Sequence, residues 1–546
     1  QLQFSFLLIR AVAHILAFED PDFLIHLGDC NGIGAPYKFQ SWGLPYKNLT
    51  DADHDFISRT LWLRIRKAYS GLTPNMPVLF ALGNHDGESS WEGPRVRARE
   101  WRQKLFPQPT DATYNEGGHP EGSYYGFSWG SDKDNRGGAQ FLVLDNSGFT
   151  GPLPSKPEDW TLGTDQYAWF QSVLERTDPE WRFACFHHVL GGWPAGSNEG
   201  EAAYAYGRGP LFTAEDYKGL TDPSKVEQVK LTELAKTHGL RAFLYGHDHI
   251  FKARRIGSGA NQRDLYGVVA GSTKHIGEFN WWRAAYWKSF YGDGFRAVPD
   301  FYGPSGITRL TIRKDQAKFE YVCTGVTPNT NLPGGGIVAA VQAGATLSNP
   351  APAIKTEVPD GPLDFVRDEL DPADSPSKLL RIRNGGGQRL DFRVVTGPEW
   401  IKVSASAGSS CLAPVNVAVS PSAGLPLPGS YVGEISVESS AAKSAKVPVR
   451  LTINAAPLFP PKNFRATSTP GIGIVLRWKA DSGSLGVVSY RISLIDGLGA
   501  RNLLAELAAS RSSTIGRKVD PSAIHGFVIV AVNSAGRESA AAFASA

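Results

Sequence analysis

The chain has 546 residues, and at about 150 residues per domain this length predicts three or four domains. Hydrophobic residues make up 42% of the chain and charged residues 20%, a globular composition that excludes a wholly disordered protein. The 56 Lys and Arg nearly balance the 53 Asp and Glu, so the net charge of +3 gives no signal for nucleic-acid binding. No run of 18 apolar residues occurs, and we therefore expect no membrane span.

The first 325 residues alternate strand-like apolar runs with helical patterns. The strand-like runs cover residues 23–27, 78–82, 141–144, 183–186 and 242–245. Helical patterns cover residues 55–68, 96–106, 165–176 and 225–237, with Thr164 as an expected N-cap. This alternation predicts an α/β domain, in which the loops that follow the strands meet at one edge of a sheet.

The remaining 221 residues have a different character. Residues 326–358 are rich in Pro, Gly and small side chains, which predicts a linker. Residues 359–455 and 456–546 each contain short alternating runs separated by turn residues, which is typical of a β-sandwich. A Pro-rich segment at 455–461 separates the two.

Each of these β-rich segments resembles a known module. The middle one, with Glu399-Trp-Ile-Lys-Val-Ser and Pro428-Gly-Ser-Tyr-Val-Gly-Glu-Ile, is similar to the BACON-like modules of bacterial extracellular enzymes. The last one, with Trp478, Tyr490 and Val530-Ala-Val-Asn-Ser-Ala-Gly, resembles a fibronectin type III domain. These resemblances imply immunoglobulin-like sandwiches, a secreted enzyme, either extracellular or periplasmic, and contacts with a glycan or a cell surface.

Polar motifs follow four of the strand-like runs of the first domain. They are Gly28-Asp29, Gly83-Asn84-His85-Asp86, His187-His188 and Gly246-His247-Asp248-His249. Their carboxylate, amide and imidazole groups together suit Fe, Zn or Mn. Two ions about 3.5 to 4 Å apart need one carboxylate between them, and Asp29 is the natural bridge. A glycine before each of three ligands lets the backbone turn sharply at the strand end.

In this order, the motifs resemble the calcineurin-like metallophosphoesterase family, which includes purple acid phosphatases. The resemblance covers about residues 1–325 and implies a four-layer α/β/β/α sandwich with a dinuclear metal centre. It implies that Asp29 bridges the metals, that Asn84, His187 and His247 bind one metal, that His249 binds the other, and that His85 assists catalysis without binding metal.

Two features depart from the family pattern. The first family block, Asp-x-His, is absent, and the chain passes from a strand-like segment at 3–6 into a helical one. Because both flanking segments look intact, we expect that the missing turn belongs between Phe6 and Ile9; a protein that truly lacks it would bind the second metal weakly. The segment Gly28-Asp-Cys-Asn-Gly also lacks the Tyr that purple acid phosphatases place three residues after the Asp, which disfavours a charge-transfer iron site.

Some assignments within the motifs are open from sequence alone. His187 is preferred over His188 as the ligand because of the family's spacing, although either imidazole could bind metal. Asp86 and Asp248 are expected to support ligands or cap helices.

The sequence therefore predicts a secreted metal-dependent phosphoesterase that hydrolyses phosphomonoesters or phosphodiesters at a dinuclear centre. The alternative is a catalytically impaired phosphoesterase fold that serves in surface assembly or adhesion, and the absence of Asp-x-His favours it.

Overall fold

The computed structural model consists of two compact units. It describes residues 2–546 except 32–42, 45–47, 89–94, 111–115, 131–137, 148–161, 189–226, 248–250, 260–262, 272–305, 325–339, 371–375, 423–427, 517–518 and 521–522. The first unit comprises residues 1–353 together with 384–390 and 410–413, and the second comprises the rest of the chain.

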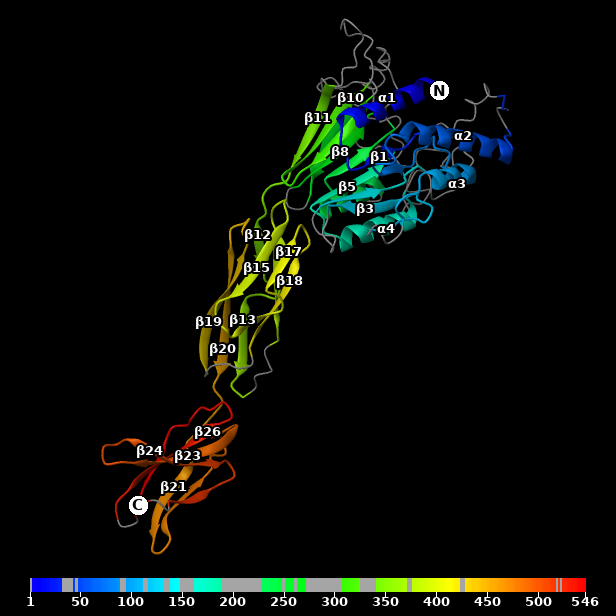
Figure 1. Ribbon diagram of the computed structural model, residues 1–546. Helices are drawn as coiled ribbons and strands as arrows, with labels where there is room; N and C mark the ends of the chain where they lie inside the picture. Colours follow the sequence, from blue (N-terminus) through cyan, green and yellow to red (C-terminus); the bar gives the residue numbers. More distant parts are fainter. Residues whose placement is uncertain are drawn as a thin grey trace, which may run out of the picture. The chain divides into compact units, whose positions relative to one another are not determined.

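Three sheets form the centre of the first unit (Figure 1). In the smallest, β1 (Leu24–Leu27) and β2 (Val78–Ala81) run parallel. The six-stranded sheet has the order β3-β4-β5-β6-β8-β7 and contains β3 (Tyr125–Trp129), β4 (Ala139–Val143), β5 (Trp181–Phe186), β6 (Ala242–Tyr245), β7 (Phe251–Ser258) and β8 (Asp264–Ala270). The third sheet is antiparallel and contains β9 (Gly306–Ile312), β10 (Gln316–Cys323) and β11 (Ala340–Ser348). Strand β11 lies in the segment for which the sequence predicts a linker.

The helices lie outside these sheets. Helices α1 (Leu2–Phe18), α2 (Asp51–Tyr69) and α3 (Arg95–Leu105) share a core cluster with β2, in which Trp62 and Phe106 pack on Phe80. Helices α4 (Gly163–Arg176) and α5 (Glu227–Thr237) cover the six-stranded sheet on one face. On its other face, side chains such as Phe183 meet Leu79 of β2 and Phe319 of β10. The layers are therefore helix, sheet, sheet, helix, and the predicted four-layer fold is confirmed.

Two of the strands that carry the polar motifs, β2 and β5, are deeply buried, whereas β1 is partly buried. All residues of β2 and β5 are buried, as expected for parallel strands covered on both faces, and their sequences are nearly continuous apolar runs. Helix α2 begins with a capping box, in which Thr50 accepts the N–H of Asp53 and the Asp53 carboxylate accepts the N–H of Thr50. The predicted Thr164 cap of α4 is wrong, because the helix begins at Gly163 and its N-cap residue makes no side-chain cap.

Helix α1 corrects the interpretation of the first residues. The segment 3–6 was expected to be a strand, but one uninterrupted helix runs from Leu2 to Phe18. Leu8, Val12 and Ile15 are buried at helical spacing, and short apolar runs are ambiguous between strand and helix. The helix therefore runs without interruption through the place between Phe6 and Ile9 where the missing Asp-x-His turn is expected from the sequence. Among the described residues, no helix is long and apolar enough to cross a membrane.

In the part of the second unit that the structure describes, all the regular elements are strands, and they form two pairs of sheets. One pair combines the sheets β12-β14-β18-β16 and β13-β20-β19-β15-β17, and the other combines β21-β22-β25 and β24-β23-β26-β27. The strands of the first pair are β12 (Ile354–Glu357), β13 (Leu363–Asp368), β14 (Lys378–Asn384), β15 (Leu390–Thr396), β16 (Ile401–Val403), β17 (Ala407–Ser410), β18 (Val415–Pro421), β19 (Gly429–Glu438) and β20 (Ala445–Asn454). Those of the second pair are β21 (Lys462–Thr469), β22 (Gly473–Lys479), β23 (Val487–Ile495), β24 (Arg501–Ala508), β25 (Ser513–Gly516), β26 (Gly526–Asn533) and β27 (Ala542–Ser545).

A shared core makes the last pair of sheets a sandwich. Trp478 of β22 and Tyr490 of β23 belong to different sheets, yet their rings pack at 5.5 Å between centroids. The predicted all-β character of this region is confirmed.

Candidate metal centre

Tight loops follow the strands at one end of the first unit. After β1, Gly28 has φ +90° and Asp29 has φ +55°; after β6, His247 has φ +62°. Positive φ is unfavourable for Asp and His, and such strain gathers at functional sites. The backbones also approach closely, since a Cβ on Gly83 would collide with the backbone and carboxylate of Asp29. These glycines thus allow two ligand-bearing loops to touch.

Four predicted ligands from four different loops converge on one point. The Nε2 atom of His187 lies 3.1 Å from Oδ1 of Asn84 and 3.3 Å from Oδ2 of Asp29. The Nδ1 atom of His247 lies 3.1 Å from the same Nε2 atom. The side chains of His187 and Asn84 are buried, and that of Asp29 is 12% exposed. The predicted convergence of Asp29, Asn84, His187 and His247 is therefore present.

The protonation of His187 indicates what this cluster is suited to hold. Its Nδ1 atom lies 2.7 Å from the carbonyl oxygen of Leu27, which can only accept, so Nδ1 carries a proton. In the neutral ring Nε2 then presents a lone pair toward the oxygens of Asp29 and Asn84. Several lone pairs that face one another are stabilised by a cation, either a proton on Nε2 or a metal ion. A backbone carbonyl that fixes the tautomer is also usual for a metal-binding histidine. The donor set fits a metal.

The pKa values of Asp29 and His187 are shifted in the directions expected for a carboxylate paired with an imidazole. Burial alone would raise the pKa of Asp29, but the charge and hydrogen bond of His187, with His85 and His247, hold that pKa well below its usual range. Burial would lower the pKa of His187, but the Asp29 carboxylate raises it instead. At neutral pH Asp29 is therefore an anion, the form that binds metal.

His85 and His188 border this cluster. The backbone N–H of His85 donates to Oδ1 of Asp29 at 2.8 Å, and His85 is less buried than its neighbours Asn84 and Asp86. His188 is fully buried, and the centroid of its ring lies 4.6 Å from that of His247 and 5.0 Å from that of His187.

His188 is also a candidate ligand by geometry. The ligand atoms of His187, His188 and His247 all lie within 4.8 Å of one another. Burial and the two neighbouring histidines lower the pKa of His188, so it is neutral and able to bind metal. Asn146 holds its main chain through two hydrogen bonds, one accepted from the N–H of His188 and one donated to its carbonyl. Both His187 and His188 therefore remain candidate metal ligands.

Asp86 lies behind the ligands rather than among them. It is 1% exposed and accepts the backbone N–H groups of Asp29 and Gly83. Burial and the nearby Asp29 raise its pKa to about 7. His249 and Asp248 lie outside the described residues.

Sequence reasoning missed several polar residues around the site. Cys30 and Asn31 donate hydrogen bonds to Asp86, and Asn146 accepts one from His188. One signal could have pointed to them: Cys30 and Asn31 directly follow Asp29, and Asn146 follows the end of β4.

Comparisons with known proteins address the first domain. Residues 5–251 match the family model of the calcineurin-like phosphoesterases. The N-terminal part of the chain is a metallophosphoesterase domain, and the all-β region follows it. A search of curated proteins found no match.

Solved structures gave matches of low overall similarity. Pectate lyase Pel3 from Pectobacterium carotovorum is 18% identical, with 15% of this chain and 25% of that chain covered and a TM-score of 0.13. An Fn3-like protein from Clostridium thermocellum is 22% identical, with 17% and 92% covered and a TM-score of 0.15. Titin domains A168–A170 are 14% identical, with 43% and 80% covered and a TM-score of 0.18. At such TM-scores these likenesses carry no argument about this chain.

Proposed function

We propose that the chain is a metal-dependent phosphoesterase whose metal centre lies at the ends of β1, β2, β5 and β6. One observation carries the proposal: Nε2 of His187 lies within 3.3 Å of donor atoms from Asp29, Asn84 and His247. This donor set occurs within a segment that matches the calcineurin-like phosphoesterases.

Each residue has a proposed role. Asn84, His187 and His247 would hold one ion, His249 would hold a second, and Asp29 would be shared between the two. The ions, of Fe, Zn or Mn, would supply Lewis acidity that neutralises charge on the phosphoryl group. His85 stabilises charge on that group or gives a proton to the leaving oxygen. The partial exposure of Asp29 and His85 supports access of a substrate to this side of the cluster.

Finer features belong to the same proposal. Substrates are phosphomonoesters or phosphodiesters, and the enzyme is secreted. The BACON-like and fibronectin type III-like modules contact a glycan or a cell surface. A purple acid phosphatase with a charge-transfer iron site is disfavoured by the sequence Gly28-Asp-Cys-Asn-Gly.

Metal analysis with substrate profiling tests the proposal. The full chain is loaded with Mn²⁺, Zn²⁺ or Fe²⁺, its bound metal is quantified, and hydrolysis is measured on phosphomonoesters, phosphodiesters and nucleotides. We expect about two ions per chain and hydrolysis of at least one ester class. A folded chain that binds no metal and hydrolyses none of them would overturn the proposal and favour the scaffold alternative.

A further inference from the structure

Asp86 joins the two loops that present the candidate ligands Asp29 and Asn84. Its Oδ2 atom accepts the backbone N–H of Asp29 and that of Gly83, both at 2.9 Å. These N–H groups belong to loops that follow the parallel neighbours β1 and β2, and they lie more than fifty residues apart in sequence. One carboxylate oxygen therefore holds both loops.

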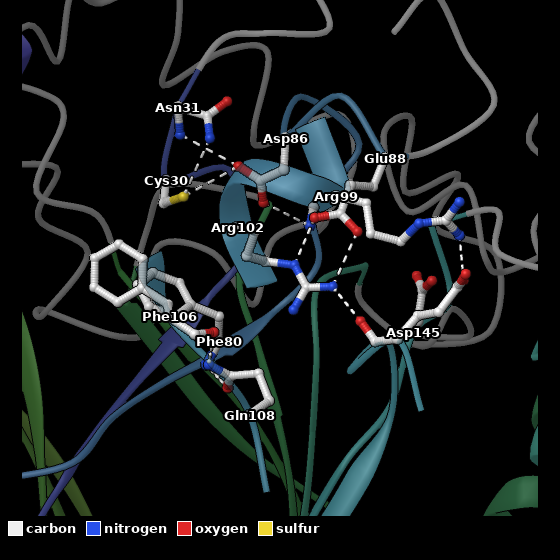
Figure 2. A network of polar contacts seen from close by, with 12 residues as sticks. Cys30, Asn31, Phe80, Asp86, Glu88, Arg99, Arg102, Phe106, Gln108 and Asp145 are labelled. Carbon is white, nitrogen blue, oxygen red and sulfur yellow. Dashed lines mark hydrogen bonds and ion pairs between the residues drawn. The ribbon is translucent and has the colours of Figure 1, made fainter. Parts of the chain in front are cut away.

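The second oxygen of Asp86 strengthens the same connection on the β1 side. Oδ1 accepts the backbone N–H of Asn31 at 3.2 Å and the thiol of Cys30 at 3.3 Å (Figure 2). Cys30 is fully buried, and Asn31 is 8% exposed. Asp86 thus accepts four hydrogen bonds, three of them from main-chain N–H groups.

Asp29 makes the reciprocal contact. While its N–H donates to Asp86, its own Oδ1 atom accepts the N–H of His85 at 2.8 Å. Each loop therefore contributes a carboxylate that binds the backbone of the other loop. Oδ2 of Asp29 remains directed at His187, at 3.3 Å.

We infer that Asp86 is a positioning residue for the ligand pair Asp29 and Asn84. It acts on the main chain of Asp29 and on that of Gly83, which directly precedes Asn84, and it touches neither metal nor substrate. The inference rests on the proposed metal centre. A carboxylate is required because all four partners are donors. An amide at this position would offer one acceptor oxygen, and its NH₂ group would face two of the donors. Buried donors without acceptors are costly, so the loops would shift.

Metal affinity of Asp86→Asn tests this role. The full chain is titrated with Mn²⁺ in competition with a chelator, at a temperature well below thermal unfolding, and thermal unfolding of the metal-free protein is recorded beside it. We expect Mn²⁺ affinity to fall about 10- to 100-fold, the scale typical of residues that orient metal ligands.

Asp178→Asn is a matched control. The Asp178 carboxylate also accepts three backbone N–H groups, those of Cys411, Leu412 and Ala413. It precedes the start of β5, whereas His187 follows the end of that strand. This variant should lose stability and keep its Mn²⁺ affinity within about threefold.

The outcomes distinguish failure of the positioning role of Asp86 from failure of the proposed metal centre. If Asp86→Asn melts earlier yet binds Mn²⁺ like the wild type, Asp86 is merely structural and the inference fails. If the wild type binds none of Mn²⁺, Zn²⁺ and Fe²⁺, the proposed function fails and the inference fails with it; if it binds only Zn²⁺ or Fe²⁺, that ion replaces Mn²⁺ in the titration. If Asp86→Asn does not fold, Cys30→Ala takes its place. An Mn²⁺ affinity of Cys30→Ala at least threefold weaker than that of Asp178→Asn supports the inference. A smaller difference, or none, overturns it.

Discussion

The first unit and the C-terminal sandwich bury different kinds of side chains. Within the described residues, the sandwich formed by β21–β27 buries an apolar core around Trp478, and its few buried polar groups include Ser489 and Asn533. The first unit buries Asp86, Arg102 and several other charged groups, and two hydrogen bonds join Arg102 to Glu88 (Figure 2).

This difference indicates where function lies. A buried charge costs folding free energy unless it is paired and hydrogen-bonded, so a fold that only needs a core avoids it. The sandwich follows that rule, with alternating strands and polar outer faces. The first unit departs from it at several places, one of which is the region around Asp29 and Asp86, where the polar groups of four loops meet. The comparison predicts that substitutions in the two regions affect different measurements.

Asp29→Asn should have the largest effect. Losing the anionic oxygen directed at His187 removes the charge that attracts cations, so bound metal should fall and kcat/KM should drop roughly 10⁴-fold, the scale of losing one member of a cooperative site. Elemental analysis and steady-state kinetics measure both. The control is Asp364→Asn on β13, an exposed position. Full metal occupancy in Asp29→Asn would contradict the bridging role proposed for Asp29.

His85→Ala should separate catalysis from metal binding. His85 contributes its backbone N–H to Asp29, and alanine retains that N–H. Metal content should therefore stay at the wild-type level while kcat falls about 10²- to 10³-fold through loss of the side chain. His525→Ala, in the C-terminal sandwich, controls for removal of an imidazole. An unchanged kcat for His85→Ala would remove it from the mechanism.

Trp478→Ala should affect only stability. The side chain is 4% exposed and packs against Tyr490, so its removal should cost about 3 kcal/mol of unfolding free energy in that sandwich. Calorimetry of the full chain should show one transition shifted to lower temperature, with kcat/KM and metal content unchanged at 25 °C. If hydrolysis falls together with this transition, the proposed division between the two regions is wrong.

Much of the fold and part of the site could be predicted from the sequence, and the reasons for the misses are physical. The ligand motifs follow nearly continuous apolar strands, so a local pattern located Asp29, Asn84, His187 and His247. The prediction of a strand at residues 3–6 was wrong because a short apolar run fits the periodicity of a helix as well as that of a strand. The contacts of Asp86 with Cys30 and Asn31 depend on how two distant loops meet, which no local pattern records.

The smallest expected effect concerns pH and His26 of β1, whose ring stacks on Phe80 at 5.6 Å. Burial lowers the pKa of His26 from 6.5 to about 4, so between these values the unfolded chain binds a proton that the folded chain does not. The stability associated with neutral His26 is therefore complete above pH 6.5 and is lost as the pH falls toward 4. Because His26 is half-buried, we expect about 1–2 kcal/mol over this window.

His26→Leu removes this titration while keeping an apolar side chain against Phe80. Urea unfolding at pH 4.5 and pH 7 should show a smaller loss of stability on acidification for His26→Leu than for the wild type. His525→Leu is the control, because that histidine lies in the other unit. Equal pH dependence of wild type and His26→Leu would show that the ring is protonated in the folded chain. In that case β1 would tolerate a charge close to Asp29. The energetic cost of buried charge in the first unit would then be smaller, at this strand, than the comparison with the C-terminal sandwich implies.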